Sequence, residues 1–421
     1  MKKLLALCIL AIFCVQCDSD DSQVTIEDNS QQVTFRMTME GDFFVSNSSG
    51  KLILSDQDGA ILVEAPLINN EETSLEVNFD PDVQYDVTVY FETFTSGTQF
   101  HFVNTYVDVS PGNYFITPVQ GYNGNEDKIT LTLTNTGDSI EVVSTSSGII
   151  TTESNSNDGG TLILNGTLPA SPGFFYASFI GPNDDFPRYS WTEGVGGSYD
   201  VNVDFPNLPM ADNEITVTLP TNATSDINIR GLKDGDPTGV SAITHIVHED
   251  SYEDGTTEYQ AFLPNGIFDN FSLTTSYTSS NDDKVHEYIM ISETVGQTVP
   301  EAGVNFTVNN DSFANFSISA SGSYDSYDVT FIYSNPDQDI VMFYDIFGEA
   351  SSTVNFSKVI LFNNLFADEP ELIAGLVPSA DRITLMDYSQ VSSYEEYLEA
   401  SWLYGPFWMV DETIERVWVR N

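Results

Sequence analysis

Carboxylates are the side chains in this sequence with the most capacity for chemistry. The chain carries 63 Asp and Glu residues, and two carboxyl groups that the fold brings together can hydrolyse a glycosidic bond. Their spacing along the chain singles out no pair. The sequence contains no Gly-x-Ser-x-Gly elbow and no phosphate-binding glycine loop. A carbohydrate-active hydrolase that uses paired carboxylates is therefore an alternative function, and no residue is assigned to it.

Two pairs of aspartates have the spacing of metal ligands. Asp56 and Asp58 precede a glycine, and Asp234 and Asp236 flank another. An EF-hand loop that began at Asp56 would need a bidentate Glu at its twelfth position, where Leu67 stands. The EF-hand is thereby excluded, but calcium also binds less regular loops at the edges of β-sandwiches. We predict no cofactor other than calcium, with these four aspartates as its candidate ligands.

Two histidines, His245 and His248, lie close together in the sequence. Ile246 and Val247 between them favour a β-strand, and residues three apart in a strand point to opposite faces. The segment also lacks the His-Glu-x-x-His order of a zinc protease. We interpret both histidines as ordinary strand residues.

Aromatic side chains offer a different chemistry. Trp402, Tyr404 and Trp408 cluster around a Gly-Pro dipeptide, and Trp191 follows a tyrosine in a second group. Exposed aromatic faces flanked by carboxylates and amides stack on sugar rings, whose C–H faces are apolar and whose edges form hydrogen bonds. The competing interpretation is that these rings fill hydrophobic cores, which aromatic residues usually do. These four residues are the candidate ligand-binding residues.

The N-terminal segment has a recognisable layout. Lys2 and Lys3 precede the apolar run 4–13, which is too short to span a bilayer, and Cys17 follows with the acidic stretch 18–22 behind it. This layout resembles the signal of a bacterial lipoprotein, and the acidic stretch resembles the export signal of surface lipoproteins in the Bacteroidota. The resemblance implies that residues 1–16 are removed, that Cys17 is lipidated, and that the protein faces the exterior from the outer membrane.

Two alternatives to this interpretation remain open. Cleavage before Cys14 would place Phe13 where a small residue is preferred, so Cys17 is favoured. In other bacteria an Asp after the lipidated cysteine causes retention in the inner membrane, and Asp18 would satisfy that rule. All three cysteines lie in or next to the signal, so the folded part has no cysteine for a disulfide or a thiolate metal site.

The charge of the chain excludes one class of partner. Thirteen Lys and Arg residues against 63 acidic ones give a net charge of −50, and no basic stripe interrupts the acidic surroundings. Such a field repels phosphates, so we predict no nucleic-acid partner. The expected partners are the membrane, through the lipid anchor, and a glycan or envelope protein.

Alternation with a period of two recurs along the chain and predicts antiparallel sheets packed face to face. Turn residues are expected at Ser49-Gly50, Asp58-Gly59 and Asp254-Gly255. The fold class is therefore all-β, with tandem antiparallel β-sandwich domains of an Ig-like or prealbumin-like type. The segment 51–62, with the strand 85–89 downstream, is similar to prealbumin-like modules of the carboxypeptidase-regulatory type, which are non-catalytic spacers.

The C-terminal region departs from the alternation. Ser393 has capping-box spacing to Glu396, and Tyr394, Tyr397, Leu398 and Trp402 share one helical face. A second short helix is expected over 368–377, and a closing strand over 414–419. The predicted segments are a signal peptide 1–16, an acidic tether 17–31, β-sandwiches 32–120, 126–221 and 225–299, and a C-terminal β domain with short helices 303–421.

The anchor, the tandem sandwiches and the absence of a catalytic motif together favour a non-enzymatic envelope protein. We expect a binding or adhesion role, with a glycan or another envelope component as ligand. The alternatives are the hydrolase described above and a purely structural spacer or subunit of an envelope complex.

Overall fold

A computed structural model describes the chain in residues 32–39, 48–78, 84–116, 127–136, 140–146, 154–157, 160–168, 173–194, 199–233, 243–253, 255–279, 283–296, 298–335, 339–367, 379–391, 393–403 and 413–420. The fold is all-β and built from sandwich-type layers, as the alternation predicts. In the first strand, for example, Phe35 and Met37 are buried while Arg36 between them is exposed. No helix among the described residues is long and apolar enough to cross a bilayer.

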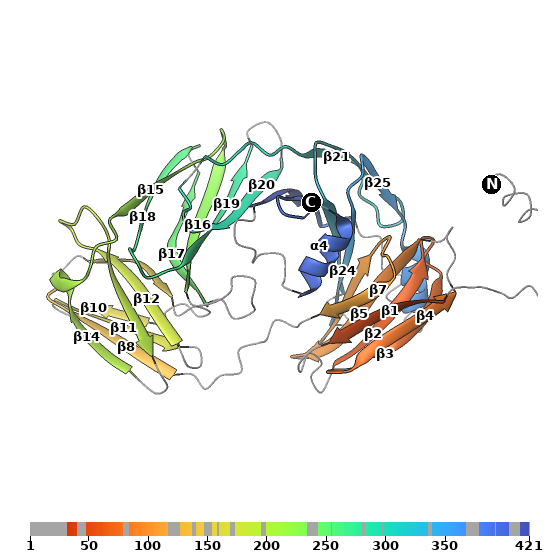
Figure 1. The fold of residues 1–421 in the computed structure, drawn as a ribbon, viewed down its shortest axis with the longest axis horizontal. Helices are drawn as coiled ribbons and strands as arrows, with labels where there is room; N and C mark the ends of the chain where they lie inside the picture. Colours follow the sequence, from red (N-terminus) through yellow and green to blue (C-terminus); the bar gives the residue numbers. More distant parts are fainter. Residues whose placement is uncertain are drawn as a thin grey trace, which may run out of the picture.

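One sheet of twelve strands runs through most of the molecule (Figure 1). Its strands, in spatial order, are β17 (Ile243–Tyr252), β16 (Thr224–Lys233), β19 (Asn270–Thr278), β20 (Val285–Ser292), β27 (Thr413–Arg420), β26 (Arg382–Tyr388), β23 (Ser326–Asn335), β24 (Ile340–Glu349), β6 (Thr98–Tyr106), β5 (Tyr85–Thr95), β2 (Ser48–Asp56) and β3 (Ile61–Leu67). The sheet therefore joins strands from the first, third and fourth predicted segments, whose boundaries stay predictions.

Two pairings hold this sheet together across long stretches of sequence. The closing strand β27 confirms the expected strand over 414–419 and lies between β20 and β26, with Ile289 opposite Ile414 and Leu385 opposite Val417. Strand β24 pairs with β6, in the one parallel pairing of the twelve-stranded sheet, and places Phe343 opposite Phe102. These two pairings connect the C-terminal strands to both halves of the sheet.

Three smaller sheets cover parts of the large one, and each contact surface is a hydrophobic cluster. Side chains that alternate along β23 show the arrangement: Val329 and Phe331 face a cluster with the β21–β22–β25 sheet, while Asp328 and Thr330 face the other way. The small sheets are β4 (Glu72–Asn78), β1 (Gln32–Met39) and β7 (Gly112–Ile116); β15 (Asn213–Thr218) and β18 (Glu258–Leu263); and β21 (Asn305–Asn310), β22 (Phe316–Ser321) and β25 (Thr353–Phe356).

A further sandwich forms the lobe at one end of the arc in Figure 1. Its two sheets enclose a core that includes Leu131, Phe175 and Phe179, none more than 1% exposed. The 3-10 helix Phe205–Asn207 follows its last strand. The strands are β10 (Ser154–Asn157), β11 (Thr161–Leu168), β8 (Asp127–Thr134) and β14 (Tyr199–Asp204), facing β13 (Arg188–Gly194), β12 (Gly173–Ile180) and β9 (Glu141–Ser146).

The α-helices among the described residues, α2 and α4, lie in the C-terminal region. Helix α4 (Tyr394–Leu403) is the predicted one, and the backbone N–H of Glu396 donates to Oγ of Ser393 at 3.2 Å, as the capping spacing requires. Its Tyr394, Tyr397 and Leu398 are at most 5% exposed. Helix α2 (Val359–Leu365) was not expected, while the helix expected over 368–377 lies outside the described residues.

The β2–β3 turn confirms Asp58-Gly59 as a turn and shows what holds it. Gly59 has a φ of +86°, and a Cβ there would lie 2.8 Å from the backbone nitrogen of Leu361 in α2. Ser49-Gly50, by contrast, is not a turn, because both residues lie inside β2 with strands paired on both sides. Hydrogen bonding to two neighbours outweighs the local preference of this dipeptide.

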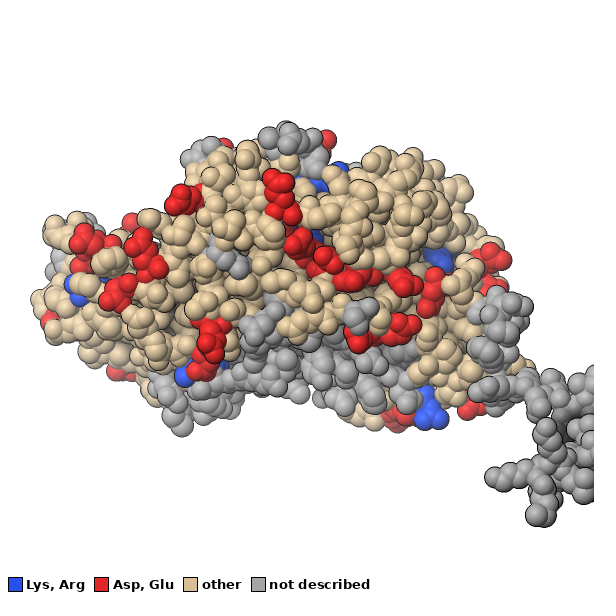
Figure 2. All heavy atoms as spheres, turned by 45° about the horizontal axis from the view of Figure 1, so that its top comes forward, with Lys and Arg blue, Asp and Glu red and all other residues tan. Residues whose placement is uncertain are grey.

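The acidic composition is visible on the surface. Figure 2 shows carboxylates spread over this face of the molecule, with only a few basic groups among them. The dispersion gives the protein a broad negative field rather than a single acidic tail.

Candidate functional site

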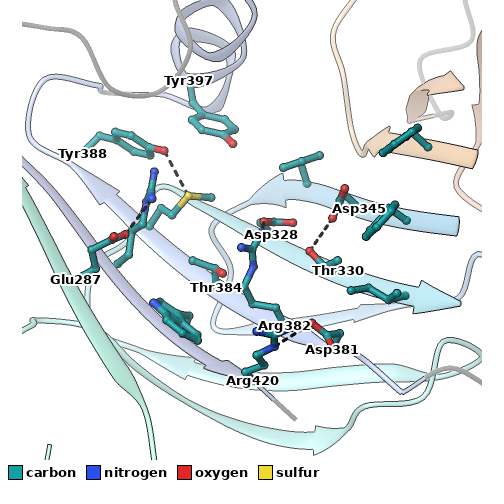
Figure 3. Close-up of a pocket in the computed structure, with 17 residues that line it drawn as sticks. Glu287, Asp328, Thr330, Asp345, Asp381, Arg382, Thr384, Tyr388, Tyr397 and Arg420 are labelled. Carbon is teal, nitrogen blue, oxygen red and sulfur yellow. Dashed lines mark hydrogen bonds and ion pairs between the residues drawn. The ribbon is translucent and has the colours of Figure 1, made fainter. Parts of the chain in front are cut away.

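A pocket of about 740 Å³ opens on the twelve-stranded sheet, and we call it the central pocket. Its floor comes mainly from β23, β24, β26 and β27, on the face opposite the β21–β22–β25 sheet. Tyr397 reaches it from α4, as Figure 3 shows. The volume lies within the range of about 300–1,000 Å³ that is typical of ligand sites.

Strand register arranges the polar side chains of the floor in rows. Thr330 on β23 lies opposite Asp345 on β24 and opposite Arg382 on β26, and Arg382 lies opposite Arg420 on β27. One row therefore presents a carboxylate, a hydroxyl and two guanidinium groups in succession. In the next row Asp328 lies opposite Thr384.

Three ion pairs lie among the side chains that line the pocket. An Nη of Arg382 donates to Oδ2 of Asp328 at 3.1 Å, and an Nη of Arg416 donates to Oε2 of Glu287 at 2.9 Å. Arg420 lies 3.5 Å from Oδ2 of Asp381. The Oγ1 of Thr330 donates to Oδ1 of Asp345 at 2.6 Å (Figure 3).

Burial changes the protonation of two carboxyl groups in the floor. The pKa of Asp328 is raised to about 7: desolvation is the largest cause, the neighbouring charge of Asp345 also raises it, and Arg382 opposes both effects. Desolvation also raises the pKa of Asp345, against the hydrogen bond from Thr330. Within the described part of the chain, Oδ1 of Asp328 is buried and has no hydrogen-bond partner. The carboxyl of Asp328 is therefore neutral in a substantial fraction of molecules near pH 7.

Aromatic rings form the walls of the central pocket. At one side, the ring centroids of Tyr388 and Tyr397 lie 5.5 Å apart, and the hydroxyl of Tyr388 donates to the sulfur of Met386. The ring of Phe102 stacks on that of Phe343, with 5.4 Å between the ring centroids and 12° between the ring planes. Trp418 projects from β27. The pocket thus combines apolar walls with a floor of alternating donors and acceptors.

Such an arrangement suits a ligand that carries several hydroxyl groups. Each hydroxyl both donates and accepts, so guanidinium donors beside carboxylate acceptors can satisfy it completely. A buried carboxyl with a pKa near 7 beside a second carboxyl also has the protonation behaviour of a general acid.

The structure places only part of the predicted ligand-binding set. Trp402 belongs to α4, but its side chain, and all of Tyr404 and Trp408, lie outside the described residues. Trp191 is partly buried on β13, where its ring stacks on Phe174 at 5.1 Å and meets Phe268 edge to face at 5.4 Å. Trp191 does not line the central pocket.

The structure describes two of the four candidate metal ligands. The Oδ1 of Asp56 accepts from the backbone N–H of Ala60 at 2.8 Å, which closes the β2–β3 turn. Asp58 lies in the same turn, and Asp234 and Asp236 lie outside the described residues. Across the described ranges, no group of three or more His, Cys, Asp or Glu has the geometry of a metal site. Calcium binding stays a prediction.

An internal cation lies close to that turn. Lys358, immediately before α2, pairs with Asp86 of β5, and both side chains are at most 4% exposed. Its Nζ also lies 3.5 Å from the backbone oxygen of Gln57. The lysine thus connects α2 to the β2–β3 turn.

Both histidines lie on a strand, as the sequence predicted. His248 lies on β17, where desolvation lowers its pKa and the charge of Asp250 opposes the effect. His245 is on the same strand, with its side chain outside the described set.

Sequence reasoning missed the residues of the central pocket, although one signal for it was present. Asp328, Asp345 and Trp418 lie in alternating segments like many others. The arginines are different: Arg382, Arg416 and Arg420 are three of only six in the chain. Their concentration within the last 40 residues is a property of the sequence itself and marks this region as unusual.

Comparison with known proteins adds little to this geometry. No protein-family model matches the sequence, and no curated protein matches it either. Among solved structures, the pilus adhesin SpaC from Lactobacillus rhamnosus GG, in its open conformation, aligns at 8% identity with a TM-score of 0.11. The alignment covers 76% of this chain and 44% of the adhesin. So low a score carries no argument about fold or function.

Proposed function

We propose that this protein is a lipid-anchored, non-enzymatic component of the cell envelope, held at the outer membrane by Cys17 and facing the exterior, that binds a glycan in the central pocket. The observation that carries the proposal is the composition of that pocket. Ion-paired guanidinium and carboxylate groups line its floor, and six aromatic side chains line its walls. In a chain this acidic, so balanced a set of donors and acceptors is best explained by a polyhydroxylated ligand.

Glycan-array binding of the folded domain tests the ligand. We expect Trp418→Ala to weaken binding by roughly tenfold or more, the loss expected for an aromatic contact of about 1.5 kcal/mol. The matched control is Phe94→Ala, which removes an aromatic ring that is 54% exposed on β5 and does not line the pocket. Equal effects of the two substitutions would contradict a glycan site in the central pocket.

Labelling of growing cells with a fatty acid tests the anchor. Cys17→Ser should abolish incorporation, while Cys14→Ser should leave it intact. The opposite result would favour cleavage before Cys14, and no label on the wild-type protein would reject the lipid anchor.

A hydrolase is the second candidate, and Asp328 favours it. A carboxyl whose pKa is about 7 is protonated in a useful fraction of molecules at neutral pH, as a general acid requires, and Asp345 supplies a second carboxyl nearby. Release of reducing ends from a bound polysaccharide would support this function. Asp328→Asn should then abolish release while binding persists.

A further inference from the structure

Arg382 and Arg420 lie directly opposite each other on β26 and β27. Both line the central pocket, and Figure 3 shows them side by side on its floor. Like charges at directly opposed positions of antiparallel strands destabilise a sheet. A negatively charged group between the two guanidinium groups would remove that penalty.

The pocket's own carboxylates satisfy these arginines only in part. Within the described residues, Arg382 makes a single hydrogen bond, to Asp328, and Arg420 makes a single 3.5 Å ion pair, to Asp381. Their side chains are 49% and 70% exposed. Each guanidinium has five N–H donors, so most donors face the pocket or solvent. The Arg420–Asp381 pair is largely exposed and contributes little net stability.

Arg416 has a different role. Its side chain is only 15% exposed, and its partner Glu287 is 23% exposed. The two lie directly opposite each other on β27 and β20. This pair belongs to the structure of the floor, and the accessible cationic surface is that of Arg382 and Arg420.

Asp328 supports an anionic ligand rather than opposing it. Its unpartnered Oδ1 is buried beside Arg382, and its pKa of about 7 leaves the carboxyl neutral in about half of the molecules at pH 7. A neutral carboxyl does not repel an anion bound at Arg382.

The aromatic wall of the pocket also favours an anionic ligand. The ring of Phe102 stacks between those of Phe91 and Phe343 on the neighbouring strands. The ring centroids lie 4.5 Å and 5.4 Å apart, and the ring planes are within 13° of parallel. Because the ring faces cover each other, the rings present their edges. Aromatic edges carry partial positive charge, so the edge of Phe102, whose two faces are covered, favours electron-rich oxygens.

We propose that the ligand of the central pocket is an acidic sugar, whose carboxylate or sulfate group is bound between Arg382 and Arg420. The inference rests on the proposed glycan-binding function and names the chemical class of glycan. Arginine suits this role because its planar fork of donors matches the two oxygens of a carboxylate or sulfate group.

The six arginines make the inference directly testable by NMR. In ¹⁵N-labelled protein, Nε–H resonances are assigned by the loss of single signals in Arg382→Gln and Arg420→Gln. The probes are sodium glucuronate for the carboxylate, glucose 6-sulfate for the sulfate, and glucose as the neutral match. We expect one or both acids to shift the Arg382 and Arg420 signals, and glucose to leave them in place.

Arg420→Gln is the main binding variant because its side chain is the more exposed and the fold does not depend on it. It should weaken binding of the acidic sugar by roughly tenfold to a hundredfold, the range expected for a hydrogen bond to a charged group. Arg230→Gln is the matched control, since it removes the same charge from an exposed position on β16. An acidic sugar that shifts the Nε–H signal of Arg230 as much as those of Arg382 and Arg420 would overturn the inference. Equal shifts with glucose would do the same.

Polysaccharides separate this inference from the proposed function. Polygalacturonate and its methyl ester share one backbone, as do dextran sulfate and dextran. Binding of only the acidic members supports both conclusions. Binding of the neutral members as strongly as the acidic ones overturns the acidic-group inference and leaves glycan binding in place. Shifts by the acidic monosaccharides without binding of any polysaccharide retain the anion site and overturn the glycan function.

Discussion

Replacement of Asp328 by Asn should change how the stability of the protein depends on pH. The side chain is 11% exposed, and it faces Asp345 on β24, Arg382 on β26 and Arg416 on β27. Its pKa is raised from 3.8 to about 7, mainly by desolvation. Asparagine has nearly the same shape and carries no charge at any of the pH values considered.

The sign follows from the two states of the chain. Below pH 4 the carboxyl is protonated in both the folded and the unfolded chain, so its full contribution is present. As the pH rises, the unfolded chain ionises freely while the folded chain holds the proton, and stability falls until the pH passes about 7. The interval between 3.8 and about 7 corresponds to ~4 kcal/mol in total, at about 1.4 kcal/mol per pH unit.

Urea unfolding, followed by tryptophan fluorescence, measures this contribution. Because the sequence pI is about 4.1, the series is best run between pH 5.5 and 8.5, where the protein keeps its charge. Over that range the free energy of unfolding of Asp328→Asn should rise relative to wild type by ~2 kcal/mol. The contribution of Asp387, whose pKa is also raised, is common to both proteins, whereas Asp345 interacts with Asp328, so the measured difference belongs to the pair.

The matched control is Asp200→Asn, which removes the same charge from an exposed position on β14. Its difference from wild type should stay constant with pH. A constant or falling difference for Asp328→Asn would refute the argument that burial keeps this carboxyl neutral.

Two further predictions concern the junction between α2 and the first strands. Lys358→Met should destabilise the protein by ~3–5 kcal/mol, because it leaves the buried Asp86 without its partner, and adding Asp86→Leu should recover most of the loss in urea unfolding. Gly59→Ala should lower the thermal midpoint of unfolding, because its φ is +86° and the new Cβ would approach the backbone of Leu361. Gly97→Ala is the control: its φ is +94° and nothing lies within 4 Å of the new Cβ, so it measures the cost of the dihedral angle alone. Equal losses at the two glycines would show that α2 does not press on the turn.

Local patterns predicted the elements of this fold well. The alternation around Phe35 and Met37 identifies a strand with one buried face, because the period of two is a property of the backbone itself. The capping spacing of Ser393 and Glu396 placed the start of α4 for a similar reason, since both atoms of the hydrogen bond lie within one turn. Gly50 was misassigned because its strand conformation depends on partners on both sides.

The arrangement of the elements was not predictable in the same way. Nothing near Phe102 or Phe343 specifies that β6 and β24 pair in parallel, because the preference arises only when the whole sheet assembles. The candidate site shares this difficulty. Asp328 resembles the other acidic residues in sequence, and its altered protonation comes from burial that distant strands and α4 impose. Only the crowding of arginines near the C-terminal end is visible in the sequence alone.

The position of β27 has a consequence for the order in which the molecule can form. It is later in the chain than every other strand of the large sheet, yet it occupies the middle of that sheet. Until it is available, β20 and β26 present open edges that could pair with another chain. Completion of the sheet must therefore wait for the last segment to be synthesised, and a chain truncated shortly before residue 413 would leave β20 and β26 unpaired and prone to aggregate.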